Sequence, residues 1–241
     1  MYEGRKIVAM IPARVDSRRI PKKNLRYLGD KLLIEHIIDT CKSAGCFGNI
    51  YINSPDDILR KIAEKNNINF FHREIWNKNR VETNDDFTHQ FLSYRAIINS
   101  EPEICILANP TSPFITVDDI HGFLNFMFQG DFETVLTVKD LYVQCLHKNN
   151  PINFNPKKKM VPTQKLAPVR MLANGLMGWD RDSYFRRWNK YKCGSLGYGG
   201  KTGYYPLHGN STIDIDWIED FKLAESIIKQ ESEGKYYEPT A

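Results

Sequence analysis

Apolar and polar residues follow one another in blocks that predict strands and helices in turn. A buried apolar run at 6–10 predicts a first strand, and an amphipathic segment at 31–45, which ends in glycine, predicts a first helix. Further strands are expected at 49–53, 68–71, 103–107 and 133–139, and further helices at 55–66, 85–99 and 117–129. This alternation predicts an α/β fold of three layers, a mostly parallel central sheet with helices on both faces.

The alternation stops between Asp140 and Ala173, a stretch with four prolines and the basic run Lys157–Lys159. Such a stretch is long for a connection inside a compact domain, so we expect a functional segment or an appendage. After it, the patterns predict that regular structure resumes at 174–179, followed by a helix at 180–188, a glycine-rich loop at 194–203, a strand at 212–216 and a helix at 217–230. We therefore expect one domain over 1–241, with 140–173 as an insertion.

Composition and charge exclude several classes of protein. The chain has 241 residues and a net charge of +4, from 33 basic and 29 acidic residues. This excess is too small to require nucleic acid as a partner, whereas a small anionic substrate would suffice. An apolar run of about 18 residues is absent, so we expect no membrane span. The five scattered cysteines and the lack of a signal-peptide pattern lead us to expect a cytoplasmic protein with reduced thiols.

Cations gather in the loop that follows the first predicted strand. Five of them lie within ten residues: Arg14, Arg18, Arg19, Lys22 and Lys23. Open α/β sheets bind ligands at the carboxyl ends of their strands, which is where this loop is expected. The planar fork of arginine and the point charge of lysine both suit a polyphosphate. The alternative interpretation is a solvated basic turn.

Two carboxylates near the end of the chain suggest a metal site. Asp214 and Asp216 alternate with Ile213 and Ile215, so on a strand they would share one face. Carboxylates so close together repel each other unless a cation lies between them. Mg²⁺ binds a few carboxylates and completes its shell with phosphate oxygens and water. The alternative is the solvent-facing edge of an amphipathic strand.

Four segments, in order, resemble those of the CMP-sialic acid synthetase (acylneuraminate cytidylyltransferase) family. Residues 13–24 resemble the signature loop Ala-Arg-x-Gly-Ser-Lys-x-x-x-x-Lys-Asn, with Arg18 at the lysine and Asp16 at the glycine. Residues 109–113, Asn-Pro-Thr-Ser-Pro, resemble the family's Gln-Pro-Thr-Ser-Pro, and 173–175 resemble its x-Asn-Gly. Residues 213–225 resemble its Ile-Asp-Ile-Asp-x-x-x-Asp-Phe-x-x-Ala-Glu block. The resemblance covers nearly the whole chain.

The resemblance implies a Rossmann-like nucleotidyltransferase fold with a dimerisation insertion. The implied reaction transfers CMP from CTP to an acidic nine-carbon sugar of sialic acid type and releases pyrophosphate, with Mg²⁺ as cofactor and a homodimer as the assembly. Such an enzyme would serve sugar-nucleotide and polysaccharide biosynthesis.

The resemblance also implies residue roles. The implied catalytic residues are Arg14, Lys23, Asp214 and Asp216, and the two aspartates are also the implied metal ligands. The implied nucleotide-binding residues are Ala13, Arg14, Ser17, Arg18, Lys23, Asn24 and Arg73. The implied sugar-binding residues are Asn109, Thr111, Ser112, Lys165, Arg170, Asn174 and Gly175.

Departures from the family pattern keep two other interpretations open. Ile115 and Thr163 stand where the family has arginines, so the acceptor could instead be legionaminate, pseudaminate, a Kdo-like acid or a non-sugar acid. Asp16 and the missing arginines would also fit a non-catalytic CTP-binding protein. A P-loop is excluded, because Ser195 stands where the first glycine of that motif would have to precede Gly200-Lys201-Thr202.

Overall fold

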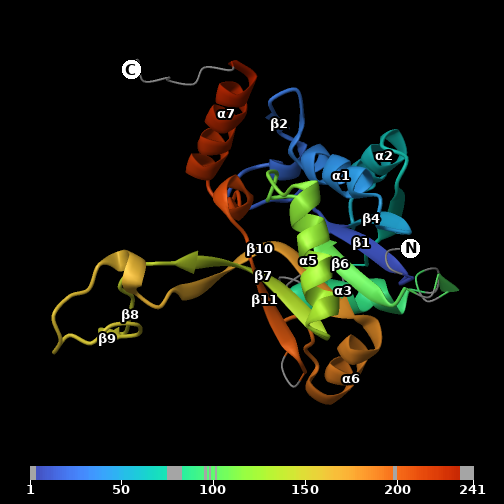
Figure 1. Ribbon diagram of the computed structural model, residues 1–241. Helices are drawn as coiled ribbons and strands as arrows, with labels where there is room; N and C mark the ends of the chain where they lie inside the picture. Colours follow the sequence, from blue (N-terminus) through green and yellow to red (C-terminus); the bar gives the residue numbers. More distant parts are fainter. Residues whose placement is uncertain are drawn as a thin grey trace.

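A seven-stranded sheet forms the centre of the computed structural model, which describes residues 4–74, 83–94, 97, 99–100, 102–197 and 200–233. The strand order is β11-β7-β10-β6-β1-β4-β5 (Figure 1). The strands are β1 (Ile7–Pro12), β4 (Asn49–Ser54), β5 (Asn69–His72), β6 (Ile104–Ala108), β7 (Thr134–Leu141), β10 (Val169–Asp180) and β11 (Thr202–Pro206). Paired neighbours are parallel, except that β10 is antiparallel to both β6 and β7. The predicted mostly parallel sheet is confirmed.

Helices cover both faces of this sheet. Successive strand residues point in opposite directions, so each face carries its own set of apolar side chains. In β1, Ile7, Ala9 and Ile11 belong to the core beneath α1 (Leu33–Ala44), α2 (Asp57–Lys65) and α5 (Val117–Gln129). Val8 and Met10 belong to the core beneath α3 (Asn84–Ser93) and α6 (Arg181–Tyr191). The three-layer expectation is confirmed.

A third apolar cluster joins the first loop to the end of the chain. Ile20 in that loop packs with Ile215 and with Phe221 of α7 (Ile218–Glu233), while Leu28 of β2 (Tyr27–Leu28) and Leu33 complete the cluster. The short 3₁₀ helix η1 (Lys23–Leu25) and the strand β3 (Lys31–Leu32) lie between these residues in the sequence. The cluster places the cationic loop beside the segment that carries the two aspartates.

Local signals predicted several elements closely. Helix α5 has the predicted bounds, and Thr116 caps it: its hydroxyl accepts a hydrogen bond from Asp119 N, and its own N–H donates to the Asp119 carboxylate. Helix α1 ends at Gly45, which has the positive φ of a C-terminal cap. The helix predicted at 85–99 is interrupted: α3 ends at Ser93, Tyr94 has extended backbone, and Ile97 and Asn99 are helical again. Residues 95, 96 and 98 lie outside the described part of the chain.

Two further expectations are wrong near the carboxyl end. Residues 212–216 are not a strand: the 3₁₀ helix η3 (Gly209–Thr212) leads into a stretch without regular secondary structure, 213–216, that joins no sheet. The glycine-rich loop predicted at 194–203 ends earlier, because Thr202 and Gly203 already belong to β11. Strand β11 lies at the sheet edge beside β7, where a glycine and a terminal proline are tolerated.

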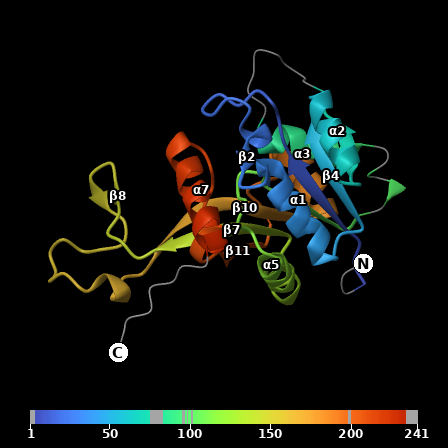
Figure 2. The same cartoon turned by 90° about the horizontal axis from the view of Figure 1, so that it is seen from above.

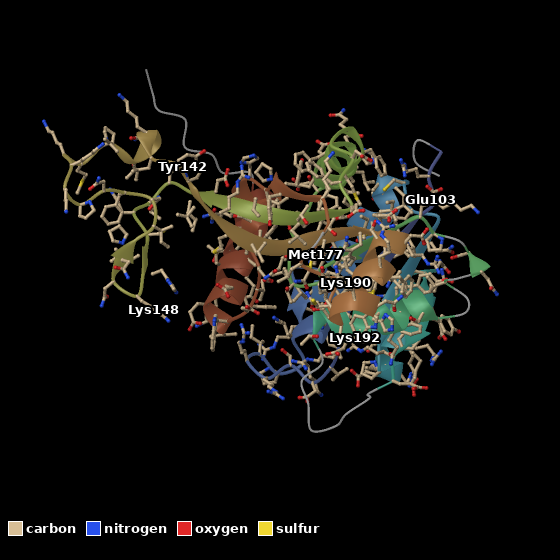
Figure 3. The ribbon with its side chains drawn as sticks, turned by 90° about the horizontal axis from the view of Figure 1, so that it is seen from below. Glu103, Tyr142, Lys148, Met177, Lys190 and Lys192 are labelled. Atoms are coloured by element: carbon tan, nitrogen blue, oxygen red, sulfur yellow. The ribbon has the colours of Figure 1, made fainter. Side chains whose placement is uncertain are left out.

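Residues 142–168, here called the arm, extend away from the sheet from the ends of β7 and β10 (Figures 1 and 2). The arm contains the small hairpin β8 (Leu146–His147) and β9 (Asn150–Pro151), and the 3₁₀ helix η2 (Thr163–Lys165). Figure 3 shows Tyr142 where the arm begins and Lys148 in its hairpin. Apolar side chains on the arm face solvent: Met160 is 82% exposed, Leu146 60% and Ile152 55%.

Two simple expectations about the chain can also be compared with the structure. Every helix in the described residues is too short or too polar to cross a membrane. All five cysteines are free thiols.

Candidate active site

A cavity opens at the carboxyl edge of the sheet, where β1 and β6 end. It brings together eight of the residues implied by the sequence: Ala13, Arg14, Ser17, Lys23, Asn24, Arg73, Asn109 and Thr111. Four residues that were not anticipated complete the lining: Pro12, Asn84, Phe87 and Pro110. Parallel strands end at the same edge of a sheet, which explains why segments far apart in the sequence meet here.

Backbone hydrogen bonds fix the first loop at the rim of this cavity. Ala13 N donates to Asn53 O at 3.0 Å, and Val15 N donates to Oδ2 of Asp56 at 2.7 Å. Asn24 Nδ2 donates to Arg14 O at 3.1 Å, which closes the loop on itself. Asn24 Oδ1 is buried and has no hydrogen-bond partner among the described residues. The cations of the loop are thus carried on a braced backbone.

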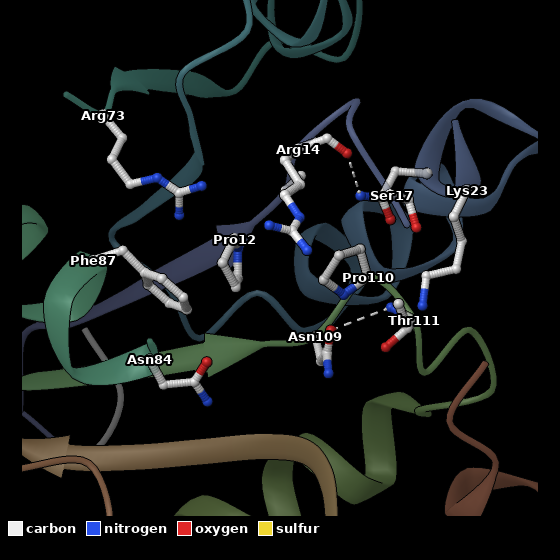
Figure 4. A pocket seen from close by; sticks show the side chains of 12 residues that line it. Pro12, Arg14, Ser17, Lys23, Arg73, Asn84, Phe87, Asn109, Pro110 and Thr111 are labelled. Carbon is white, nitrogen blue, oxygen red and sulfur yellow. Dashed lines mark hydrogen bonds between the residues drawn. The ribbon is translucent and has the colours of Figure 1, made fainter. Parts of the chain in front are cut away.

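The cavity has two chemically different ends (Figure 4). At one end, the Arg73 guanidinium lies 5.0 Å from the centre of the Phe87 ring, and Asn84, one turn earlier on α3, points into the same space. At the other end lies Lys23, with Arg14 between the two ends. One end therefore offers an aromatic ring, an amide and the Arg73 guanidinium, and the other offers the Lys23 ammonium.

The acidic stretch 213–216 contacts the cationic end. Lys23 Nζ donates to the carbonyl oxygen of Ile215 and lies 3.5 Å from Oδ1 of Asp216. Asp216 Oδ2 lies 2.6 Å from Nη1 of Arg19. The Thr111 hydroxyl donates to Oδ1 of Asp214. Neither aspartate lines the cavity itself, but each contacts a residue that does.

Burial changes the pKa of two of these groups. Burial raises the pKa of Asp214, the neighbouring Asp216 adds to this, and the hydrogen bond from Thr111 opposes it. Burial lowers the pKa of Lys23, and the nearby Asp216 and Asp214 oppose this. Both groups are ionisable side chains held partly away from water, which is typical of functional sites.

The two aspartates fit a metal ion that a substrate helps to coordinate. The described residues contain no cluster of three or more His, Cys, Asp or Glu side chains that could hold a metal unaided. Mg²⁺ commonly takes one or two carboxylates and obtains its other ligands from phosphate and water. A cation would also relieve the cost of the buried Asp214 carboxylate beside Asp216. The donor set therefore fits Mg²⁺ as a partner of a bound polyphosphate.

The residues implied in sugar binding are not all gathered in the cavity. Ser112 is buried with its hydroxyl oxygen unpartnered among the described residues, and it does not line the cavity. Gly175 is buried too, and its carbonyl accepts a hydrogen bond from Asn109 N at 3.0 Å. A side chain at Gly175 would come within 2.9 Å of Ile115, so this glycine permits close packing below the Asn109 turn.

Asn174 lies at an irregularity in β10. Its φ of 54° is left-handed, and the pairing of β10 with β7 shifts between Leu172 and Met177. Asparagine tolerates this conformation better than most residues. Such an irregularity redirects a side chain, and Asn174 is exposed at the edge that carries the cavity.

Three implied residues lie away from the cavity. Arg18 is exposed and does not line it. Arg170 pairs with Asp140 at 3.1 Å at the base of the arm. Lys165 lines a separate hollow within the arm. In this single chain, the last two do not meet Asn109.

Asn84 and Phe87 were missed because they belong to a helix on the opposite side of the sheet from α1. Their local signal was the capping box of Thr83 and Asp86, which places a helix start at Asn84. That signal says nothing of a ligand, and packing of α3 against the strands brings the two side chains to the cavity.

The sequence matches a family model described as Cytidylyltransferase over residues 8–239. The chain belongs to the cytidylyltransferase family. An N-acylneuraminate cytidylyltransferase of Escherichia coli O18:K1:H7 is 28% identical over an alignment of 249 positions, which covers 95% of this chain and 54% of that protein. One from Streptococcus agalactiae serotype III is 22% identical over 224 residues, 90% of this chain and 52% of that protein. The chain thus spans about half the length of these curated relatives.

Other members of this family differ in their named substrate. A 3-deoxy-manno-octulosonate cytidylyltransferase 2 of Hydrogenovibrio crunogenus is 20% identical, over 74% of this chain and 71% of that protein. Two solved structures share the fold. A 4-diphosphocytidyl-2C-methyl-D-erythritol synthase from Anaerococcus prevotii has a TM-score of 0.68 at 16% identity, over 94% of this chain and 100% of that one. A CMP:2-keto-3-deoxy-manno-octonic acid synthetase complexed with CTP has a TM-score of 0.65 at 15% identity, over 94% of this chain and 99% of that one.

Proposed function

We propose that this protein transfers CMP from CTP to an acidic sugar and releases pyrophosphate. The observation that carries the proposal is the cavity at the carboxyl edge of β1 and β6, which has cations at one end and an acidic pair beside them. Membership of the cytidylyltransferase family supports the same reaction class.

The two ends of the cavity suit the two ends of a nucleoside triphosphate. The aromatic ring of Phe87 and the amide of Asn84 suit a nucleobase, while Arg14, Ser17 and Lys23 suit the phosphates. The unpartnered Asn24 Oδ1 can accept a hydrogen bond from the nucleotide. In the reaction, the sugar hydroxyl attacks the α-phosphorus in line, the bond from that phosphorus to the bridging oxygen breaks, and pyrophosphate leaves.

The residues of the chain act by positioning and by neutralising charge. Arg14 and Lys23 stabilise the charge that builds on the leaving pyrophosphate, and Asn109 with Asn174 orients the acceptor. Asp214 and Asp216 would hold Mg²⁺, which when bound lowers the charge at the α-phosphate and assists ionisation of the attacking hydroxyl. Thr111 keeps the Asp214 carboxylate in place.

The acceptor we propose is a nine-carbon acid of sialic acid type, the substrate class named for two relatives. A Kdo-like or related acid is the second candidate, because Ile115 replaces the family arginine and is buried against Gly175 rather than facing the cavity. A non-catalytic CTP-binding protein has less support, because Asp16 is exposed and does not line the cavity.

We further propose a homodimer that forms through the arm. The support is the row of exposed apolar side chains along a segment that extends away from the sheet. The arm also carries Lys165, and Arg170 lies at its base, so a second subunit's arm could supply cations to an acceptor site that lacks them in one chain.

Pyrophosphate release from CTP and Mg²⁺ tests the proposed reaction, against a panel of eight- and nine-carbon α-keto acids. We expect release with one acid, reduced about 10²- to 10³-fold by Lys23→Met, which removes the buried cation beside the acidic pair. Lys22→Asn, an exposed neighbour whose φ of 54° asparagine tolerates, serves as the matched control. Binding of CTP without release from any acid would contradict the proposal and favour the non-catalytic alternative.

A further inference from the structure

Arg19 connects the first loop to the acidic stretch. Its Nη1 lies 2.6 Å from Oδ2 of Asp216, and its guanidinium carbon lies 5.1 Å from the centre of the Trp217 ring. Both contacts are to residues that precede α7. Arg19 therefore bridges the cation-rich loop and the proposed metal ligands.

The contact with Arg19 occupies an oxygen that a metal would need. Asp216 Oδ1 faces Lys23 at 3.5 Å and Oδ2 faces Arg19, so each oxygen already has a cationic partner. Asp214 Oδ1 accepts the Thr111 hydroxyl. A divalent ion that binds Asp216 through Oδ2 would compete with Arg19 for that oxygen.

The Arg19 contact is suited to exchange, whereas the Lys23 contact is not. The side chains of Arg19 and Asp216 are 48% and 46% exposed, so water can replace either partner and the pair is weak. Lys23 is buried and is also held by the carbonyl of Ile215. A cation that binds Asp216 would therefore displace Arg19 before it displaces Lys23.

We propose that Arg19 is an exchangeable counter-cation: it neutralises Asp216 until a divalent metal arrives, and the displaced guanidinium then turns to the triphosphate. The proposal rests on the proposed function for the metal and the nucleotide. Arg19 and Arg14 belong to the same braced loop, so the released side chain stays at the rim of the cavity. Arg19 is a positioning residue, because its first role is exerted through Asp216.

Metal binding without nucleotide tests the competition directly. Mn²⁺ binding is measured by electron paramagnetic resonance on the wild type, Arg19→Gln and Arg18→Gln. The Arg18 variant is the matched control, since it removes the same charge from an exposed position of the same loop. We expect Arg19→Gln to bind Mn²⁺ about twofold to tenfold more tightly than Arg18→Gln. Equal or weaker binding by Arg19→Gln, or no Mn²⁺ binding by either variant, overturns the proposal.

The emission of Trp217 gives a second readout. We expect Mg²⁺ to change tryptophan fluorescence in the wild type, Trp217→Phe to abolish the change, and Asp216→Asn to show the altered emission without metal. If the Arg19–Asp216 contact were fixed and metal did not displace it, Mg²⁺ would leave the tryptophan fluorescence unchanged, and that result overturns the proposal. Both measurements omit CTP and acceptor, so their outcome is separate from that of the pyrophosphate assay.

Discussion

The hydroxyl of Thr111 donates a hydrogen bond to Oδ1 of Asp214, although 103 positions separate the two residues in the sequence. The bond joins the turn that follows β6 to the stretch that precedes α7. It stabilises the ionised form of a carboxyl group whose pKa burial raises. One hydroxyl therefore orients a proposed metal ligand and favours its ionised form.

Loss of this hydroxyl should weaken the metal site more than the fold. Thr111→Val keeps the shape of the side chain but removes the donor, so we expect Mg²⁺-dependent pyrophosphate release to fall about 10- to 100-fold. Thr111→Ser keeps the donor and is the control. A Val variant with wild-type dependence of rate on Mg²⁺ concentration would show that Thr111 does not orient the carboxylate.

Replacement of Asp214 should stabilise the protein. A carboxyl whose pKa is raised by folding favours the folded state below its unfolded pKa, and this contribution is lost as the pH rises through the folded pKa. At pH 7 the charged form is therefore a cost, which Asp214→Asn removes while its Oδ1 can still accept from Thr111.

The measurement is thermal unfolding at two pH values. We expect Asp214→Asn to raise Tm at pH 7 by roughly 2–4 °C, the shift that a gain of about 1 kcal/mol in the free energy of unfolding produces in a chain of this length. The gain should shrink in acid, below pH 4. Asp216→Asn is the matched control and should give no gain, since it breaks the contact with Arg19. A lower Tm for Asp214→Asn at pH 7 would contradict the desolvation argument.

Phe87 should affect nucleotide binding and not the chemical step. Phe87→Leu removes the aromatic face beside the Arg73 guanidinium, so we expect KM for CTP to rise about threefold to tenfold with little change in kcat. Phe91→Leu is the control on the same helix, because Phe91 is buried in the core and does not line the cavity. Equal KM values for the two variants would remove Phe87 from the nucleotide site.

Charge on the arm should separate the proposed dimer. Leu146→Lys combined with Met160→Lys places two cations at exposed apolar positions of the arm, and we expect light scattering to report a monomer where the wild type is a dimer. Ile58→Lys, at a 50% exposed position on α2, is the control and should stay dimeric. A wild type that is monomeric at assay concentration would exclude the arm as a stable interface.

Much of the fold follows from local sequence. The apolar periodicity gave both ends of α5, and Gly45 gave the end of α1. The cationic loop followed from a general rule, because a loop after the first strand of an α/β sheet lies at its binding edge. These predictions needed no knowledge of contacts distant in the sequence.

The expectations that were wrong depend on distant contacts. The alternation of Ile213 to Asp216 is typical of a strand, but a strand also needs a neighbour to pair with, and the sequence does not say whether one exists. Strand β11 is short and contains a glycine, so its own sequence is a weak strand signal. Its pairing with β7 is what makes this segment a strand. Likewise, Phe87 reaches the cavity through packing of α3, which the pattern of that helix does not encode.

The pairing of Leu141 with Val169 at the root of the arm has a consequence for how this protein can be altered. The chain leaves the sheet after Leu141 and re-enters it at Val169, which is paired with Leu141, so residues 142–168 leave and return at the same end of the antiparallel pair β7–β10. A short turn could join the two ends without moving a residue of the seven-stranded sheet. The arm can therefore be exchanged, lengthened or deleted as a module while the catalytic framework keeps its register.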